Sequence, residues 1–277
     1  MKKEKYIINP SELTYICHHC AHIKHNYKLE DRGISAGITG ELDTLEKNFF
    51  LGDVKKLDQR IPKGKIIDAD HKNESFVSKI LFDNKKRPFR IRGKGDALIE
   101  FNDKTHGIID YKTSKFKDKK GKNYNKELLK KINEYNRQLH CYDILYSHLE
   151  THTEYLEKID KGVAMGWPEK TIKKRVAEKV EHIKKISINK TTLLGLVFVY
   201  PEKIIDDKLL NINFSFEYKN VEYNPVKFME FLTAYIDKLE EKKPPPVPTE
   251  CKNPKASQHC VMHSHFYDQK KLPKRIG

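Results

Sequence analysis

The chain has 277 residues, with 54 Lys or Arg against 39 Asp or Glu, so its formal net charge is +15. Hydrophobic residues make up 38% of it, which supplies enough apolar surface for a core and excludes a largely disordered chain. The longest apolar run, 193–200, is too short to cross a bilayer, and no apolar segment of a signal peptide follows the basic N-terminus. We therefore expect a soluble, cytoplasmic protein.

The positive charge is concentrated in two stretches. Residues 112–131 contain nine Lys and two acids, and residues 169–190 contain eight Lys or Arg and three Glu. An excess of this kind favours a polyanion such as nucleic acid as the partner. Runs of charge are also typical of solvated faces, so charge alone leaves both interpretations open.

The first third of the chain is predicted to contain helices within 9–30, 36–50 and 73–82. The first of them follows a plausible N-cap at Asn9-Pro10-Ser11-Glu12. Between 89 and 112 the apolar residues change to a period of two, which indicates strands. The residues that share one parity are Phe89, Ile91, Ala97, Ile99 and Phe101.

A hairpin is expected here, because Asn102-Asp103-Lys104 can turn the chain into a return strand over 107–113. Apolar residues then recur three and four apart over 125–150, which predicts a long amphipathic helix. The remaining predicted elements, in chain order, are a charged helical insertion over 151–190, a buried strand over 193–200 ended by Pro201, a strand over 211–218, a helix over 225–241 and a Cys/His-rich tail over 244–277. This order predicts one mixed α/β domain spanning 1–277.

The segment from Gly93 to Thr113 carries the most informative pattern. Side chains of a strand alternate between its two faces, so Asp110 and Lys112 point to the same side of the return strand. Asp96 lies on the partner strand with the parity opposite to that of the apolar residues. Two carboxylates and one ammonium group can therefore meet on one polar face, although a surface hairpin with an ordinary Asp–Lys pair would give the same spacing.

Two neighbouring carboxylates repel each other unless a cation lies between them, and their oxygens suit Mg²⁺. A bound Mg²⁺ lowers the pKa of its water and neutralises charge on a phosphoryl oxygen. A nearby Lys can orient the attacking water and stabilise the transition state. Asp96, Asp110 and Lys112 thus fit the hydrolysis of a phosphodiester bond.

The segment GKGDALIEFNDKTHGIIDYKTSK resembles motifs II and III of the PD-(D/E)XK nucleases, in particular the G-x-x-D and D-x-K-T of the RecB-like branch. Gln138 and Tyr142 match the Q-x-x-x-Y of that branch, and INPSELTYIC resembles its opening S-x-L and Cys pattern. Residues four apart lie on one helix face, so both side chains of the Q-x-x-x-Y motif can reach one site. The resemblance implies the restriction-endonuclease-like fold, with a mixed central sheet flanked by helices.

The resemblance also implies roles for these residues. Asp96 and Asp110 would bind Mg²⁺ or Mn²⁺, Lys112 would be catalytic, and Gln138 would support the site. Tyr142 and Lys115 would contact DNA, although Tyr142 also lies on the apolar stripe of its helix. The third metal ligand would come from the helix after Gly37: Glu41 fits best, and Asp43 and Glu46 are the alternatives.

The cysteines form two pairs near the chain ends. Cys17 and Cys20 have a chelate spacing, Cys251 and Cys260 are eight residues apart, and Cys141 is expected to be a small buried residue. Many RecB-like nucleases close a four-Cys iron–sulfur cluster between the chain ends, with one Cys early and three late. The two-and-two arrangement here leaves a 4Fe–4S cluster, a Zn²⁺ site completed by His, and no metal as open alternatives.

The sequence therefore predicts a divalent-metal-dependent DNA nuclease, an exonuclease in DNA repair, processing or phage and defence systems. Its substrate would be single-stranded or end-containing DNA. No ATP-binding P-loop motif occurs, so work on duplex ends would need a separate helicase or recombination partner. The alternatives are a catalytically silent nucleic-acid-binding module on the same fold and an adaptor organised by the Cys/His metal.

Overall fold

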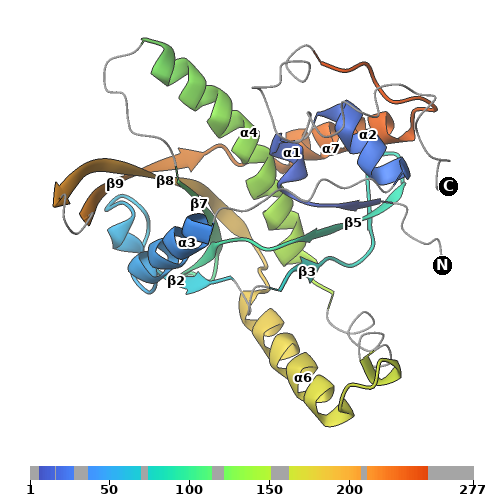
Figure 1. Cartoon of the computed structure of the whole chain (residues 1–277), viewed down its shortest axis with the longest axis horizontal. Helices are drawn as coiled ribbons and strands as arrows, with labels where there is room; N and C mark the ends of the chain where they lie inside the picture. Colours follow the sequence, from blue (N-terminus) through green and yellow to red (C-terminus); the bar gives the residue numbers. More distant parts are fainter. Residues whose placement is uncertain are drawn as a thin grey trace.

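The computed structural model describes residues 6–15, 17–27, 37–69, 74–113, 122–150, 162–206 and 211–248 (Figure 1). The helices are α1 (Glu12–Tyr15), α2 (His18–Tyr27), α3 (Gly37–Phe50), the short 3₁₀ helix η1 (Val54–Lys56), α4 (Lys122–Ser147), α6 (Glu169–Ile186) and α7 (Pro225–Glu240). The strands are β1 (Tyr6–Ile8), β2 (Gly64–Asp68), β3 (Phe76–Val77), β4 (Leu81–Phe82), β5 (Pro88–Gly93), β6 (Ala97–Phe101), β7 (His106–Thr113), β8 (Thr191–Asp206) and β9 (Asn211–Val221).

The larger sheet has five strands in the order β2-β6-β7-β8-β9. β7 and β8 are parallel and the other neighbours are antiparallel, so the sheet is mixed. One face packs on α4, where Leu139 and Leu145 join Ile108 and Leu196 in a core. The other face packs on the end of α3 and on η1 through a second apolar cluster. The predicted mixed α/β fold is confirmed.

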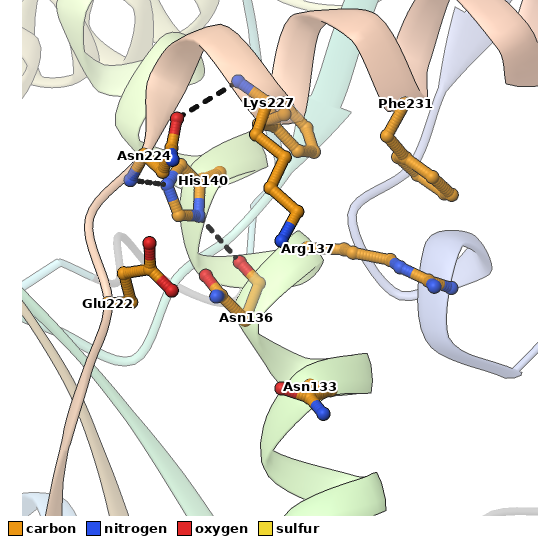
Figure 2. Close-up of a pocket in the computed structure, with 9 residues that line it drawn as sticks. Asn133, Asn136, Arg137, His140, Glu222, Asn224, Lys227 and Phe231 are labelled. Carbon is orange, nitrogen blue, oxygen red and sulfur yellow. Dashed lines mark hydrogen bonds between the residues drawn. The ribbon is translucent and has the colours of Figure 1, made fainter.

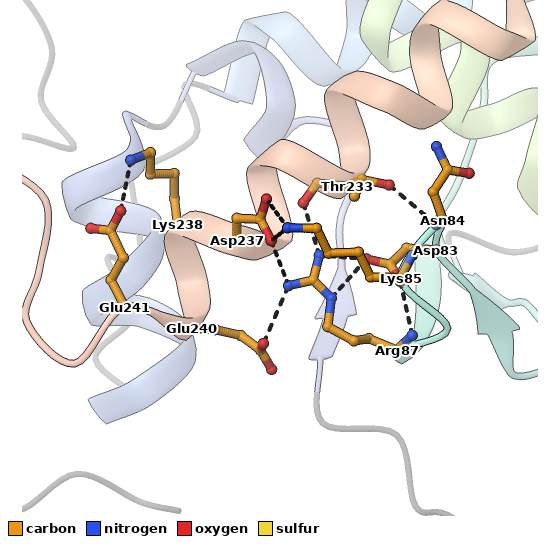
Figure 3. A network of polar contacts seen from close by, with 9 residues as sticks. All are labelled: Asp83, Asn84, Lys85, Arg87, Thr233, Asp237, Lys238, Glu240 and Glu241. Atoms are coloured by element: carbon orange, nitrogen blue, oxygen red, sulfur yellow. Dashed lines mark hydrogen bonds and ion pairs between the residues drawn. The ribbon is translucent and has the colours of Figure 1, made fainter.

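The smaller sheet pairs β1, β3 and β4 with β5, and α2 and α7 lie beside it (Figure 1). A network of ion pairs fastens α7 to the β4–β5 turn (Figure 3). The guanidinium of Arg87 lies 2.5 Å from Asp83, 2.8 Å from Asp237 and 3.2 Å from Glu240, and Lys85 lies 2.7 Å from Asp237. The network holds α7 in place over this sheet.

Three local predictions are wrong. The helix predicted over 73–82 does not form in the described part of this range, 74–82: Phe76–Val77 and Leu81–Phe82 are two-residue strands that pair with β5. Phe89 and Ile91 do not share a face with Ala97, because the chain leaves the smaller sheet at Gly93 and enters the larger one after Asp96. Pro201 does not end its strand either, since β8 continues to Asp206 past a register shift that tolerates the missing N–H.

Helix α6 lies within the predicted insertion and projects away from the two sheets (Figure 1). One of its cations is not at the surface: Lys179 is buried, and its ammonium donates to Glu74 at 2.7 Å and to the carbonyl of Ser75 at 3.0 Å. Lys179 therefore fastens α6 to the segment before β3 and is not free for a polyanion. No helix in the described ranges is both long and apolar enough to cross a membrane.

Candidate active site

The β6–β7 hairpin places Asp96 and Asp110 together. Ala97 pairs with Ile109, so Asp96, directly before β6, lies beside the end of β7. The backbone N–H of Tyr111 donates to Oδ2 of Asp96 at 2.9 Å. Ile109 and Tyr111 point into the core under α3, which leaves Asp110 and Lys112 on the opposite face, as the alternation predicts.

Asp110 and Lys112 form a close ion pair. The ammonium of Lys112 lies 2.5 Å from Oδ2 of Asp110, which is 1% exposed, and 4.8 Å from the ring centroid of Tyr135. Burial raises the pKa of Asp110 to about 7; the charge of Lys112 opposes this rise, and the nearby negative charge of Asp96 adds to it. The charge of Lys112 therefore compensates the burial of the Asp110 carboxylate incompletely.

The two glycines before Asp96 allow close approach of other elements. The N–H of Gly95 donates to the hydroxyl of Tyr146 on α4 at 2.7 Å, and a Cβ at this position would lie 2.9 Å from that oxygen. A Cβ on Gly93 would lie 2.7 Å from Cδ of Pro10. Both positions therefore require glycine, and they fix the path of the chain into Asp96.

Helix α3 contributes a third acid, Glu46, to this region. Its carboxylate is buried and accepts a hydrogen bond from Oγ1 of Thr113, at the end of β7, at 3.1 Å. Burial raises the pKa of Glu46 to about 7, and the negative charges of Asp43 and Asp96 contribute to the rise. The ammonium of Lys47 lies 2.8 Å from Asp43 and 3.5 Å from Asp96.

Glu41, the first choice for the third acid, is exposed near the start of α3. Positions five apart on an α-helix point roughly 140° away from each other, so Glu41 and Glu46 lie on different faces. The structure therefore brings Glu46, and not Glu41, against the β7 end of the hairpin. The sequence could place the helix but could not choose the face that meets the sheet.

Gln138 and Tyr142 lie on the face of α4 that covers the hairpin. Nε2 of Gln138 donates to the hydroxyl of Tyr142 at 3.0 Å, and both side chains are buried. Burial raises the pKa of Tyr142 well above its usual value, and the charges of Asp110 and Asp96 add to the rise. Tyr142 is packed in the core, so contact with DNA stays a prediction for it; Lys115 lies outside the described residues.

The cysteine pairs are only half described, since Cys251 and Cys260 lie outside the described residues. Cys20 is buried in α2, and its N–H donates to Sγ of Cys17 at 3.5 Å. Two of the neighbouring histidines bind backbone carbonyls: Nδ1 of His19 contacts Pro245 at 2.7 Å, and Nε2 of His22 contacts Glu241 at 2.8 Å. These contacts hold the start of the proline-rich segment on α2, and the described residues of this region show no site for an iron–sulfur cluster or zinc.

An apolar groove that the sequence reasoning missed begins at Glu46. The groove has a volume of about 230 Å³ and is lined by Leu45, Glu46, Phe49, Phe50, Val199, Phe214, Ser215 and Phe216. Phe49 is 56% exposed, and Phe214 and Phe216 are 41% and 42% exposed. Phe214 and Phe216 are two apart on the edge strand β9, so their side chains share one face. This spacing is the feature of the sequence that could have indicated the groove.

Across the described ranges, no three His, Cys, Asp or Glu side chains converge closely enough to hold a metal ion as they stand. The chemistry of the donors nevertheless suits a hard divalent cation, because Asp96, Asp110 and Glu46 offer carboxylate oxygens and two of them have raised pKa values. A cation at this place would offset the burial of these carboxylates and the repulsion between them, which together raise the two pKa values.

Comparison with known proteins gives a matching family model and similar solved structures. Residues 31–255 match the model of the PD-(D/E)XK nuclease superfamily. No curated protein matches the chain. Among solved structures the chain is similar to one titled "Crystal structure of SSO0001", with 14% sequence identity and a TM-score of 0.44 over 98% of this chain and 89% of that chain.

Proposed function

Because this chain belongs to the PD-(D/E)XK nuclease superfamily, we propose that it is a divalent-metal-dependent nuclease that hydrolyses phosphodiester bonds of DNA at Asp96, Asp110 and Lys112. The observation that carries the proposal is the buried Asp110–Lys112 pair, held beside Asp96 by a single hairpin. Buried acids with raised pKa values cluster at functional sites more often than at structural ones.

Asp96, Asp110 and Glu46 would hold the Mg²⁺ or Mn²⁺, with Glu46 in the place first expected for Glu41. When bound, the ion supplies a water of lowered pKa and neutralises charge on the phosphoryl oxygen. The N–H of Tyr111 fixes one oxygen of Asp96, and Thr113 fixes Glu46. These contacts arrange the carboxylates before any ligand arrives.

Lys112 would orient the attacking water and stabilise the negative charge of the transition state. Its ammonium is positioned by Asp110 and by the face of the Tyr135 ring. Gln138 lies outside the group of proposed metal ligands and Lys112. Its amide nitrogen donates to the hydroxyl of Tyr142, which covers the same hairpin. We assign Gln138 a positioning role.

The proposed substrate is single-stranded or end-containing DNA, degraded as by an exonuclease. The groove beside Glu46 supports this choice, because exposed phenyl rings provide a stacking surface for unpaired bases. The basic stretches 112–131 and 169–190 would hold the phosphate backbone. Lys115 in the first stretch would contribute to this binding, whereas Lys179 in the second would not, because it is paired with Glu74. Work on duplex ends in repair or defence would then need a separate helicase.

A metal held by the cysteines is a separate part of the proposal. Cys17 and Cys20 would bind a 4Fe–4S cluster or Zn²⁺ together with Cys251 and Cys260. The contact of His19 with Pro245 supports the idea that the two chain ends meet, since it brings the segment before the tail to α2. Such a site would be structural.

A second candidate function is nucleic-acid binding without catalysis. It is favoured by the two lysines that lie beside the carboxylates: Lys47 lies 3.5 Å from Asp96, and Lys112 lies 2.5 Å from Asp110. In this case the cations would replace a metal permanently. DNA would then be bound and released uncut.

The test compares Lys112→Ala with the wild type on labelled single-stranded DNA in Mg²⁺ or Mn²⁺. Loss of the ammonium should reduce the cleavage rate by about 100-fold or more, since it acts at the charge that develops in the transition state. Lys65, an exposed lysine on the edge strand β2 of the same sheet, gives the matched control: Lys65→Ala should cleave normally. Cleavage by Lys112→Ala at the wild-type rate would refute the assignment, and DNA retention without any cleavage by the wild type would favour the silent module.

A further inference from the structure

A second cavity, of about 340 Å³, lies between α4 and α7 (Figure 2). Helix α4 contributes four of its lining residues, α7 contributes three, and the link from β9 to α7 contributes two. They are Asn133, Asn136, Arg137, His140, Glu222, Asn224, Lys227, Phe228 and Phe231. None of them belongs to the proposed catalytic group, and the volume is in the range of small-ligand pockets.

The cavity has two cations and one acid. The guanidinium of Arg137 lies 4.3 Å from the ring centroid of Phe231, a cation–π contact that helps to position it. Within the described part of the chain, neither Arg137 nor Lys227 forms an ion pair with a carboxylate, in contrast to Lys238 further along α7, which lies 2.6 Å from Glu241. The ammonium of Lys227 and the guanidinium of Arg137 therefore keep their charge available to a ligand.

His140 forms a rigid neutral wall of this cavity. The N–H of Asn224 donates to Nε2 of His140 at 2.8 Å, so the proton of the ring is on Nδ1, which donates to the carbonyl of Asn136 at 2.9 Å. The ring stacks between Tyr223 and Phe228, with centroids 5.5 Å and 5.4 Å away, and burial lowers the pKa of His140. The positive charge of the cavity therefore comes from Arg137 and Lys227.

Two further features suit a phosphorylated ligand. Asn224 caps α7 by accepting from the N–H of Lys227 at 3.0 Å, so the positive end of a 16-residue helix faces this region. The side-chain oxygen of Asn136 is buried without a hydrogen-bond partner among the described residues, and it can accept from a hydroxyl or a base N–H. The two cations and the unsatisfied acceptor of Asn136 together suit a nucleotide better than a simple anion.

We propose that this cavity binds the phosphate of one nucleotide, outside the proposed catalytic centre. Arg137 presents a planar fork that matches phosphate oxygens, and Lys227 adds a point charge. The phosphate can belong to a strand of nucleic acid or to a released mononucleotide. Arg137 directly precedes Gln138 on α4, so a strand held here would lie around the same helix that covers the hairpin. The proposal concerns binding only, so it can fail while the nuclease assignment stands.

The experiment measures binding of a fluorescent single-stranded oligonucleotide to the full chain in EDTA, where no cleavage interferes. Arg137→Gln and Lys227→Gln should each weaken binding by about fivefold at moderate salt and reduce the dependence of log affinity on log salt by roughly one counterion. Lys238→Gln is the matched control, because it removes the same charge from the same helix where an acid already pairs with it. This variant should bind as the wild type does.

A parallel titration with thymidine monophosphate separates the two sources of phosphate. If Arg137→Gln weakens binding of the oligonucleotide alone, the cavity holds a phosphate of a strand. If it weakens binding of both ligands, the cavity also binds the free nucleotide. Arg137→Lys should recover part of the affinity, since it keeps the charge and loses the fork. Wild-type binding of both ligands by Arg137→Gln and Lys227→Gln would overturn the proposal, with thermal unfolding confirming that each variant is folded.

Discussion

Glu12 and Asp110 are equally buried carboxylates, each 1% exposed, yet their pKa values move in opposite directions. Burial alone would raise the pKa of Glu12, but the hydrogen bond and charge of His25 and the charge of Lys24 outweigh it and lower the pKa. Its two oxygens lie 2.7 Å from Lys24 and 2.8 Å from His25, and the hydroxyl of Tyr235 donates at 3.2 Å. Burial raises the pKa of Asp110 to about 7.

The difference comes from the partners of each acid. Glu12 has two basic side chains and a hydroxyl, and it joins α1, α2 and α7. Asp110 has one cation and a second carboxylate nearby, so part of its charge stays uncompensated. A buried carboxylate with uncompensated charge does not stabilise a fold, whereas a site that binds a cation needs such a charge. We therefore expect Glu12 to serve stability and Asp110 to serve activity.

The largest expected effect is the loss of DNA cleavage caused by the substitution Asp110→Asn. The substitution removes a proposed metal ligand, so cleavage of single-stranded DNA should fall by about 1,000-fold or more. The unfolding temperature of the metal-free protein at pH 8 should stay the same or rise, because a costly buried charge is removed. Single-turnover cleavage and thermal unfolding in EDTA check the two halves. Strong destabilisation would show that Asp110 has the same role as Glu12.

The next effect is on stability, and it concerns Glu12→Gln. Two basic side chains would lose their buried counter-charge, so the free energy of unfolding should fall by about 3 kcal/mol. Cleavage per folded molecule should not change. Urea unfolding measures this loss. Glu100→Gln is the control, because Glu100 is 43% exposed in its pair with Lys104, and its substitution should lower the free energy of unfolding by less than about 1 kcal/mol. A loss of activity without a loss of stability would contradict the comparison.

The sequence predicts Asp110 better than Glu12. Strict alternation in a hairpin defines which residues share a face, so the positions of Asp96, Asp110 and Lys112 follow from local pattern. Glu12 stands in a four-residue helix, and its partners His25 and Tyr235 are brought to it only by the packing of α2 and α7. No local pattern carries that information.

The same reasoning explains the other misses. The two-residue strands within 74–82 are too short to show a period, and they form because β5 offers partners. Helix α3 could be predicted from its own residues, but the choice of Glu46 over Glu41 depends on which face meets β7. The cavity between α4 and α7 joins residues almost 100 apart in the chain, so only the fold shows it.

The last expected effect is the pH dependence of stability, and it separates the two acids by sign. In metal-free protein, unfolded Asp110 releases its proton near the ordinary pKa of 3.8, whereas the folded form keeps it up to about 7. The stability of the wild type relative to Asp110→Asn should therefore fall as pH rises from about 4 to 7, by at most about 1.4 kcal/mol per pH unit. Glu12 has a lowered pKa, so the stability of the wild type relative to Glu12→Gln should instead be lost as pH falls below its ordinary pKa of 4.5. Urea unfolding in EDTA at several pH values measures both differences. A flat difference for Asp110→Asn would mean that Lys112 compensates the carboxylate completely, and the contrast between the two acids would then disappear.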